Sequence, residues 1–530
     1  MVPSGYEDGT LGSLKPLDGT GDFTFTRGSD ISATRVNEDG YIEKGYENLL
    51  LQSNSFDTTW VKSNASVTSG QAGYDGTNDA WLLSKSAANG MEYQSISSSG
   101  VQTISIYAKK GANSWMQIYA VGSTNVRTYY DLENGVLGAY ALNIIDRKIE
   151  DVGNGWYRCS VTFNSSITNV RIFVSDGNND DTGTSGTIYV QDAMLNQGLV
   201  AYPYVETTTA PVAGGILEDM PRLDYSGSCP ALLLEPQRTN VVPQSEYFAG
   251  AWFTNATLTS NYGISPEGVR NSTRVNYSGA SQYLAIGFQG AAGTGSVYVK
   301  GVIGETITIG AGGAGGGSLH TLNGEWQRVS FYDNGTSSFF TINTYNNASA
   351  RDIEVFGAQI EQDATYPTSY IPTYGTSQTR LVEKLADGID IGSFTSNYNT
   401  LFFDWGDMED KSTFNKEIVR GWSSTDNTTN SFRIVSLTDG RSRYQVYTSA
   451  GNSVSYDYTH TTRDKIALVL NGLNSKLFVN GSLVNTYGID VSQGLRQFNY
   501  NGFSRNVTNQ FTIFPTALSD DECIALTTIS

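Results

Sequence analysis

Residues 47–60 read ENLLLQSNSFDTTW, and the same pattern returns as TNVVPQSEYFAGAW at residues 239–252. An Asn, a Gln-Ser pair, a Phe and a Trp keep their places in both copies. Later segments match in the same order: 105–109 with 296–300, 154–160 with 324–330, and 188–197 with 353–362. A constant order of matches over such a length predicts two homologous domains, of which the second is shortened.

Each copy contains short strand-like segments. In the first copy, residues 103–109, 115–119, 157–163 and 170–174 are apolar or alternating runs bounded by Gly, Asn and Ser clusters. Such runs predict strands, and many short strands joined by turns predict two-sheet sandwiches of the jelly-roll type. The composition agrees, because 57 Gly, 32 Tyr and only 16% charged residues favour strands over exposed helices.

A third unit begins near residue 385. Its clearest element is an apolar run that ends in a hairpin at Asn480-Gly481, a pair suited to the positive φ angles of a type I′ turn. Near the C-terminus, Ser519 followed by Glu522 forms a capping box and predicts one short helix. The predicted fold class is therefore all-β, with tandem jelly-roll sandwiches followed by a third sandwich.

Charge and cysteine content exclude several classes of protein. The net charge of −19 would repel nucleic acid, so we expect no nucleic-acid partner. Cys159, Cys229 and Cys523 are too far apart to suggest a disulfide framework or a metal cluster. The longest aliphatic run, residues 466–470, is far shorter than a membrane span, and the N-terminus lacks the pattern of a secretory signal. We expect no membrane insertion.

Two segments resemble a motif of bacteriophage tail and appendage proteins, especially those of phages that infect Bacteroidetes. They are residues 22–43, DFTFTRGSDISATRVNEDGYIE, and residues 221–240, PRLDYSGSCPALLLEPQRTN. The two repeat copies resemble carbohydrate-binding jelly-roll modules, and the C-terminal unit resembles a laminin-G or concanavalin-like sandwich. The resemblance divides the chain into an attachment or linker segment (1–44), module 1 (45–210), a linker (211–238), module 2 (239–384) and the C-terminal domain (385–530).

Candidate catalytic residues are few. The chain has two histidines, His320 and His460, far apart in sequence. Paired carboxylates could hydrolyse a glycan, and the acids at 404, 407, 409 and 410 cluster near Trp405, but one loop of acids is normally a solvated turn. We therefore expect a protein that is not an enzyme, with no catalytic residue.

A carbohydrate-binding face is the better candidate site. Alternation along residues 115–119 places Trp115, Gln117 and Tyr119 on one side of a strand, and Arg127 with Tyr129 on one side of the next. Aromatic rings stack on sugar rings, while amide and guanidinium groups bind sugar hydroxyls. The alternative is that Trp115 and Tyr119 point into the core.

Two loops have compositions that can be compared with known ion-binding loops. Asp176, Asp180 and Asp181 lie in an Asp- and Asn-rich loop that could bind Ca²⁺, although such clusters are also ordinary turns. We expect no other cofactor. The glycine run at 310–318 lacks the Lys and Ser or Thr of a phosphate-binding loop, which predicts a flexible or tightly packed loop instead.

Together, the resemblance and the residues lead us to expect a structural, adhesive virion protein, a tail fibre or other appendage subunit whose sandwiches bind host surface polysaccharide. The phage resemblance implies a homotrimer, contacts with other virion proteins and a location on the tail or the capsid. Two alternatives stay open: a capsid-decorating or head-fibre protein without a glycan role, and a tail spike that depolymerises polysaccharide.

Overall fold

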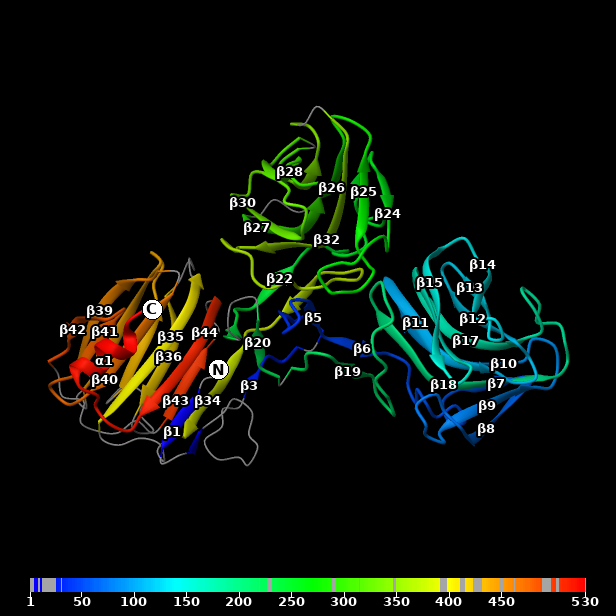
Figure 1. The fold of residues 1–530 in the computed structure, drawn as a ribbon, viewed down its shortest axis with the longest axis horizontal. Coiled ribbons are helices and arrows are strands. Elements are labelled where there is room, and N and C mark those ends of the chain that lie inside the picture. The colour runs from blue at the N-terminus through cyan, green and yellow to red at the C-terminus, as the bar shows by residue number, and fades with distance from the viewer. Residues whose placement is uncertain are drawn as a thin grey trace.

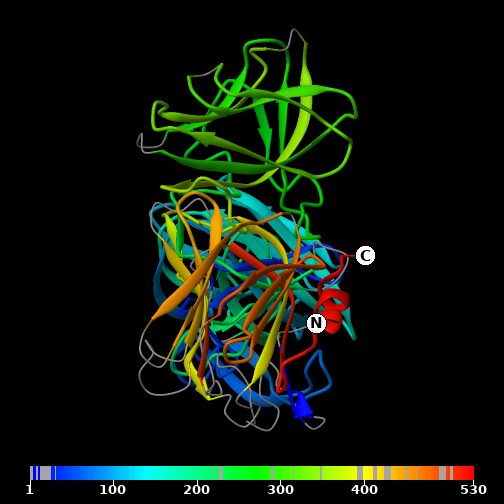
Figure 2. The same cartoon turned by 90° about the vertical axis from the view of Figure 1, so that its left-hand side faces the viewer.

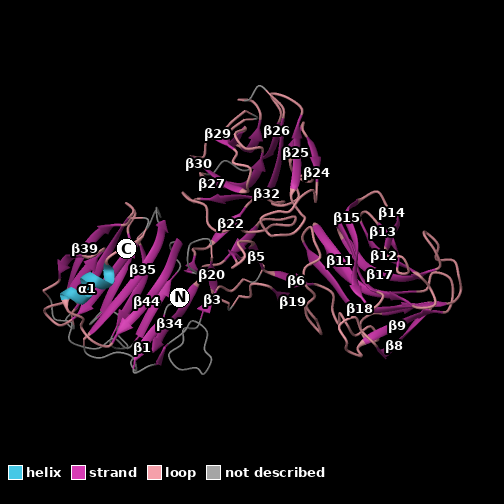
Figure 3. Cartoon of the chain, viewed as in Figure 1, coloured by secondary structure: helices cyan, strands magenta, loops and turns pink. Residues whose placement is uncertain are grey.

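The structure is a computed structural model of the 530-residue chain. It describes residues 4–529 except 8–9, 12–24, 30, 219, 226–230, 288–291, 314, 347–348, 391–397, 410–414, 423–430, 449–451, 462, 489–496 and 502–504. Figure 1 shows three β-bodies placed around a small central region, and Figure 2 shows the second body standing away from the other two. The regular secondary structure of the described part is almost entirely strand, and its one helix is α1, Asp520–Thr527 (Figure 3). The predicted all-β fold class is confirmed.

The first sandwich packs two six-stranded sheets, in the orders β14-β13-β12-β17-β10-β7 and β15-β16-β11-β18-β9-β8. Its core residues alternate along the strands, as Met116, Ile118 and Ala120 do on β12. The strands are β7 (Val61–Ser63), β8 (Ala65–Gln71), β9 (Ala80–Lys85), β10 (Met91–Ser98), β11 (Val101–Lys110), β12 (Trp115–Gly122), β13 (Val126–Asp131), β14 (Val136–Tyr140), β15 (Ile144–Gly153), β16 (Trp156–Asn164), β17 (Ile167–Ser175) and β18 (Gly186–Gln197).

The second sandwich repeats this arrangement with shorter strands. One sheet has the order β23-β26-β31-β28-β29, and the other includes β24-β25-β32-β22-β33, with β27 beside β32 and β30. The strands are β22 (Arg238–Asn240), β23 (Phe253–Thr254), β24 (Thr257–Thr259), β25 (Thr273–Tyr277), β26 (Tyr283–Gly287), β27 (Gly293–Gly301), β28 (Thr306–Ala311), β29 (Ser318–Thr321), β30 (Gln327–Asp333), β31 (Phe339–Asn343), β32 (Arg351–Gln362) and β33 (Gln378–Arg380).

Hydrogen bonds of the repeated residues are the same in both copies. The Asn48 side chain donates to the carbonyls of Ala193 (3.2 Å) and Val205 (2.9 Å). In the second copy, Asn240 donates to Ala358 (3.2 Å) and Ile371 (2.8 Å). The repeat read from the sequence is therefore also a structural repeat.

The third sandwich has the sheet orders β2-β1-β44-β35-β40-β41-β42 and β3-β34-β43-β36-β37-β38-β39. The expected turn at Asn480-Gly481 is present, with φ of 49° and 79°. Ser519 and Glu522 form the expected capping box. The strands of this unit are β1 (Ser4–Glu7), β2 (Thr10–Leu11), β3 (Phe25–Thr26), β34 (Lys384–Asp390), β35 (Asn399–Glu409), β36 (Lys416–Trp422), β37 (Ser431–Ser436), β38 (Arg441–Tyr447), β39 (Ser453–Thr459), β40 (Asp464–Leu470), β41 (Lys476–Val479), β42 (Ser482–Thr486), β43 (Gln497–Asn501) and β44 (Arg505–Phe514).

Two segments expected to be linkers contribute strands to this third sandwich. From the N-terminal segment, β3 pairs with β34. From the linker at 211–238, β20 (Arg222–Asp224) pairs with β21 (Ala231–Leu234), and β21 pairs with β44. The side chains of β21 are all buried, so its apolar run is a core strand rather than a connection. The exact domain boundaries stay a prediction.

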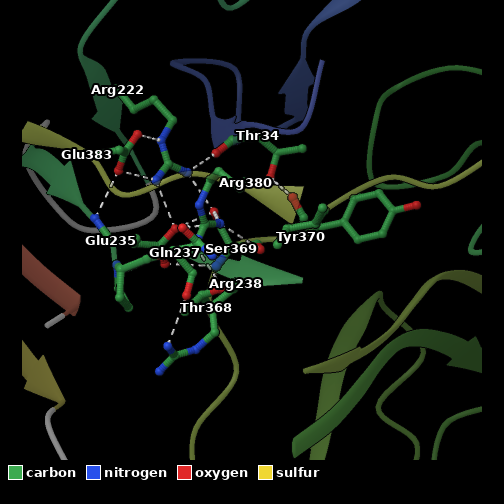
Figure 4. A network of polar contacts seen from close by, with 12 residues as sticks. Thr34, Arg222, Glu235, Gln237, Arg238, Thr368, Ser369, Tyr370, Arg380 and Glu383 are labelled. Atoms are coloured by element: carbon green, nitrogen blue, oxygen red, sulfur yellow. Dashed lines mark hydrogen bonds and ion pairs between the residues drawn. The ribbon is translucent and has the colours of Figure 1, made fainter. Parts of the chain in front are cut away.

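The centre of the molecule holds the short pairs β4 (Thr34–Val36) with β5 (Ile42–Lys44), and β6 (Tyr46–Asn48) with β19 (Val212–Gly214). Beside them lies a buried network of charges (Figure 4). Arg222 pairs with Glu235 at 2.8 Å and with Glu383 at 2.5 Å. Arg380 pairs with Glu235 at 3.0 Å. Because all four side chains are buried, each charge depends on its partners for compensation.

A second buried network lies where the first and second sandwiches meet. Lys44 lies 2.6 Å from Glu246 and 2.5 Å from Glu267, and its ammonium also faces the rings of Tyr202 and Tyr374. Burial opposes the charge of Lys44, but the two carboxylates outweigh burial and raise its pKa. The two networks join the sandwiches through fixed polar contacts.

Within the described ranges, no helix is both long enough and apolar enough to span a membrane. Cys159 and Cys523 are buried free thiols, and Cys229 lies outside the described residues.

Candidate functional site

The five predicted sugar-binding residues lie together on the outer face of the sheet β14-β13-β12-β17-β10-β7. On β12, Met116 and Ile118 fill the core, so Trp115, Gln117 and Tyr119 point to the other side. On β13, Val126 and Tyr130 fill the core, which places Arg127 and Tyr129 on the same outer side. The alternative, in which Trp115 and Tyr119 point into the core, is wrong.

Strand register builds a row of side chains across this face. Tyr119 lies opposite Arg127 on β13 and opposite Arg171 on β17, and Arg171 lies opposite Tyr93 on β10. The guanidinium carbon of Arg171 is 5.6 Å from the ring centre of Tyr119 and 5.8 Å from that of Tyr93. We name these four residues, Tyr93, Arg171, Tyr119 and Arg127, the Tyr-Arg row.

Arg171 and Tyr93 were not predicted from the sequence. The strand at 170–174 is recognisable, but its partner strands are not, because register is set by the folded sheet. The sequence did contain a signal for Arg171. Val170 and Ile172 are core residues, so alternation along β17 places Arg171, which lies between them, on the outer face.

A second row beside the first is buried and hydrogen-bonded. Gln117 and Tyr129 each donate to Oδ2 of Asp181 at 2.8 Å, and Ser175 donates to Oδ1 at 2.6 Å. Burial and the bond to Asp181 raise the pKa of Tyr129. Gln117 and Tyr129 are each only 1% exposed, so these two predicted residues support the face rather than meet a ligand.

The three aspartates of the predicted calcium loop each bond to different protein groups. Asp181 supports the sheet, Asp176 pairs with Lys85 at 2.5 Å, and Asp180 accepts the backbone N–H of Thr182 at 3.0 Å. The three carboxylates thus have separate protein donors, and calcium binding by this loop stays a prediction. Across the described part of the chain, no group of three or more His, Cys, Asp or Glu side chains is placed to hold a metal ion.

The corresponding sheet of the second sandwich presents a different face. Strand order makes β28 and β31 the counterparts of β12 and β17, and their outer residues include Thr308, Thr341 and Asn343. Thr341 and Asn343 both donate to the carbonyl of Gly316 at 2.9 Å. The glycine run therefore folds over this face.

Glycine is required in that loop because its two arms touch. A Cβ added to Gly312 would lie 2.7 Å from the Cα of Gly316. The tightly packed form of the predicted loop is therefore the one present. Its backbone occupies the surface that the Tyr-Arg row leaves open in the first sandwich.

Of the four acids considered for glycan hydrolysis, only Asp404 has a described side chain. Asp404 accepts two hydrogen bonds from Arg463, at 3.0 and 2.7 Å, and one from Asn509 at 3.1 Å. Although burial raises the pKa of Asp404, these bonds lower it below its usual value. The side chains at 407 and 409, and the whole of residue 410, lie outside the described residues.

The two histidines have structural surroundings. His460 bonds Asp464 through Nδ1 at 2.7 Å and lies among the rings of Trp405, Tyr444 and Tyr458. Burial lowers the pKa of His320 in the second sandwich. The histidines belong to different sandwiches, which separates them from any shared site.

No family model and no curated protein sequence matches the chain. Among solved structures, the CBM40 module of the Ruminococcus gnavus IT-sialidase is 16% identical and covers 27% of this chain and 97% of its own, with a TM-score of 0.21. The tandem CBM22 domains of Paenibacillus barcinonensis Xyn10C are 11% identical, cover 67% and 98%, and have a TM-score of 0.21. Trypanosoma rangeli sialidase is 9% identical, covers 95% and 98%, and has a TM-score of 0.22. At these scores the likeness carries no functional information.

Proposed function

We propose that the chain is a structural and adhesive subunit of a bacteriophage appendage, which binds a host surface polysaccharide without cleaving it. The observation that carries the binding proposal is the Tyr-Arg row on the outer face of the first sandwich. Two tyrosine rings offer apolar faces to sugar rings, and the guanidinium groups between and beside them can bind hydroxyl or carboxylate oxygens. Tyr93, Arg171 and Tyr119 are partly exposed and Arg127 is exposed, so a ligand can reach them.

The acids of this face support binding rather than hydrolysis. A glycosidase needs two carboxyl groups that face the scissile bond from opposite sides. Asp181 is occupied by Gln117, Tyr129 and Ser175, and Asp131 accepts the backbone N–H of Glu133 at 2.9 Å. Carboxylates held in this way stabilise the sheet and the adjoining turn.

The virion role rests on the sequence resemblance to phage appendage proteins. It entails a homotrimer and contacts with other virion proteins, and it places the chain on the tail or capsid of the particle. Light scattering of the purified chain gives the number of subunits, and antibody labelling of phage particles gives the position. A particle that carries no label at any surface would exclude this role.

Tyr119→Ala provides the test of binding. We expect it to weaken binding of the host polysaccharide by roughly tenfold, because one stacking surface worth about 1 kcal/mol or more is removed. Tyr332→Ala is the matched control, since Tyr332 is 54% exposed on the second sandwich. Equal affinity of the wild type and Tyr119→Ala would exclude this face as the site.

The polysaccharide samples from this binding test also distinguish the proposed adhesin from a depolymerising spike and from a capsid-decorating protein. Under the proposal, the bound polysaccharide keeps its chain length when analysed by size-exclusion chromatography. Shortening of the polymer would instead identify a depolymerising spike. Binding to capsid shells without binding to any host polysaccharide would identify a capsid-decorating protein.

A further inference from the structure

Two arginines flank Tyr119 on the strands at either side of it. Arg171 on β17 donates from Nε to Oδ1 of Asn169 at 2.8 Å, which holds the guanidinium between the two tyrosines, 5.6 and 5.8 Å from their ring centres. Within the described ranges, neither of its two terminal nitrogens donates to a protein acceptor, so both can bind a ligand. Arg127 on β13 is exposed, and its guanidinium carbon lies 6.0 Å from the ring centre of Tyr129.

Neither arginine forms an ion pair with a carboxylate among the described residues, although the chain has 52 acidic and only 33 basic residues. Other arginines are paired, as Arg274 is with Asp352 at 2.5 Å and Arg443 with Asp457 at 2.7 Å. Asp181 on the same side of the sheet forms no ion pair with either arginine and accepts three hydrogen bonds from neutral protein donors. The Tyr-Arg row is therefore a local positive surface on an acidic protein.

The spacing of the arginines suits a polymer. Neighbouring strands lie about 4.8 Å apart, so backbones two strands apart are separated by roughly 10 Å. A sugar ring stacked on Tyr119 would have one guanidinium on each side along the chain direction. A planar guanidinium binds a carboxylate through two parallel hydrogen bonds, a geometry that a neutral hydroxyl cannot match.

We infer that the Tyr-Arg row selects polysaccharides whose sugars carry carboxylate groups, with Arg127 and Arg171 binding two acidic sugars on either side of a ring stacked on Tyr119. This inference rests on the proposed function and adds the ligand class. It is specific to the first sandwich, because in the second the corresponding residues Thr308, Thr341 and Asn343 are buried, and Thr341 and Asn343 bond to the glycine loop that covers them.

The test compares acidic polymers with neutral versions of the same chains. Polygalacturonate, alginate and hyaluronate are each measured beside a form whose carboxyl groups have been chemically reduced to alcohols. The full-length protein should bind at least one acidic polymer, and its carboxyl-reduced form should bind at least tenfold more weakly. Binding should also weaken as NaCl is raised, since the contact is ionic.

Arg127→Gln and Arg171→Gln should each weaken binding of the acidic polymer roughly tenfold, while affinity for the reduced polymer changes little. Arg270→Gln is the matched control, since Arg270 is exposed on the second sandwich and away from this face. Dextran sulfate and dextran form a further arm. If dextran sulfate binds as tightly as the carboxylated polymer, the assignment to carboxylates is overturned.

The outcomes separate this inference from the proposed function. Equal binding of acidic and reduced polymers, or failure to bind any of the three acidic polymers, would overturn the inference. If a neutral host polysaccharide then bound and Tyr119→Ala abolished that binding, the proposed function would stand. If no polysaccharide bound at all, both would fall.

Discussion

Glu92 on β10 points into the core of the first sandwich, where it is fully buried. Neither of its carboxylate oxygens has a hydrogen-bond partner among the described residues, and burial raises its pKa to about 8. The opposite residue on β17 is Ile172, which belongs to the apolar core. A carboxyl group in this position is stable only while it is protonated.

The buried carboxyl group of Glu92 predicts that the stability of the first sandwich depends on pH. The folded state holds the Glu92 proton up to about pH 8, whereas an unfolded chain releases it near pH 4.5. The free energy of unfolding therefore falls as pH rises from about 4.5 to 8, by up to a few kcal/mol, and stays lower above that range. Glu92→Gln should remove this fall, because the amide stays neutral.

Denaturant unfolding from pH 5 to 9 measures the effect. The stability difference between the wild type and Glu92→Gln should change with pH in favour of the variant. Glu325→Gln, at an exposed position of the second sandwich, should show no such trend. A difference that stays constant across the pH range would contradict the assigned burial of a protonated Glu92.

At the scale of strands, the repeated residues Asn48 and Asn240 connect segments that are distant in sequence through side-chain hydrogen bonds. Besides its two donated bonds, Asn240 accepts the backbone N–H groups of Val242 and Ile360, both at 3.1 Å. Asn48 does the same for Leu50 and Leu195, at 3.1 and 3.2 Å. Loss of the side chain would leave buried backbone groups unsatisfied.

Asn48→Ala and Asn240→Ala should therefore each destabilise their own sandwich by roughly 3 to 5 kcal/mol. Hydrogen exchange followed by mass spectrometry can assign the loss of protection to one sandwich. Asn143→Ala, at an exposed site, is the control and should leave exchange unchanged. Equal loss of protection in both sandwiches from one substitution would mean that the asparagine does not act locally.

Features that depend on a local pattern of residues, such as strand faces and tight turns, could be predicted from the sequence. Alternation along β12 places Trp115, Gln117 and Tyr119 on one face, and the Asn480-Gly481 pair specifies its turn. The sequence does not predict which strands become neighbours, so Arg171 and Tyr93 were missed. It also does not reveal that β3 and β21 complete the third sandwich, because their partners lie far away in the chain.

At the scale of the whole molecule, the central charges hold segments from several parts of the chain. Arg27 from the N-terminal segment and Arg222 from β20 both bind Glu383, at 3.2 and 2.5 Å. Arg222 also donates to the carbonyl of Thr34 at 2.6 Å. The network thereby ties β20, the β4-β5 hairpin and the segment after the second sandwich to one another.

Glu383→Gln should loosen this centre, because removing one buried charge leaves two buried arginines undercompensated, at a cost of roughly 3 to 5 kcal/mol. Small-angle X-ray scattering should show a larger radius of gyration, and limited proteolysis should cut near the centre. Asp457→Asn is the matched control, since it breaks surface ion pairs of Arg441 and Arg443. An unchanged scattering curve and cleavage pattern for Glu383→Gln would show that the network does not fix the arrangement.

Hydroxyl-radical footprinting of the full chain with bound host polysaccharide tests most directly whether the Tyr-Arg row of the first sandwich is the binding face. Bound ligand should suppress oxidation of Tyr93 and Tyr119, and leave that of Tyr332 on the second sandwich unchanged. Protection confined to the second or third sandwich, with Tyr93 and Tyr119 oxidised as in the free protein, would contradict this assignment.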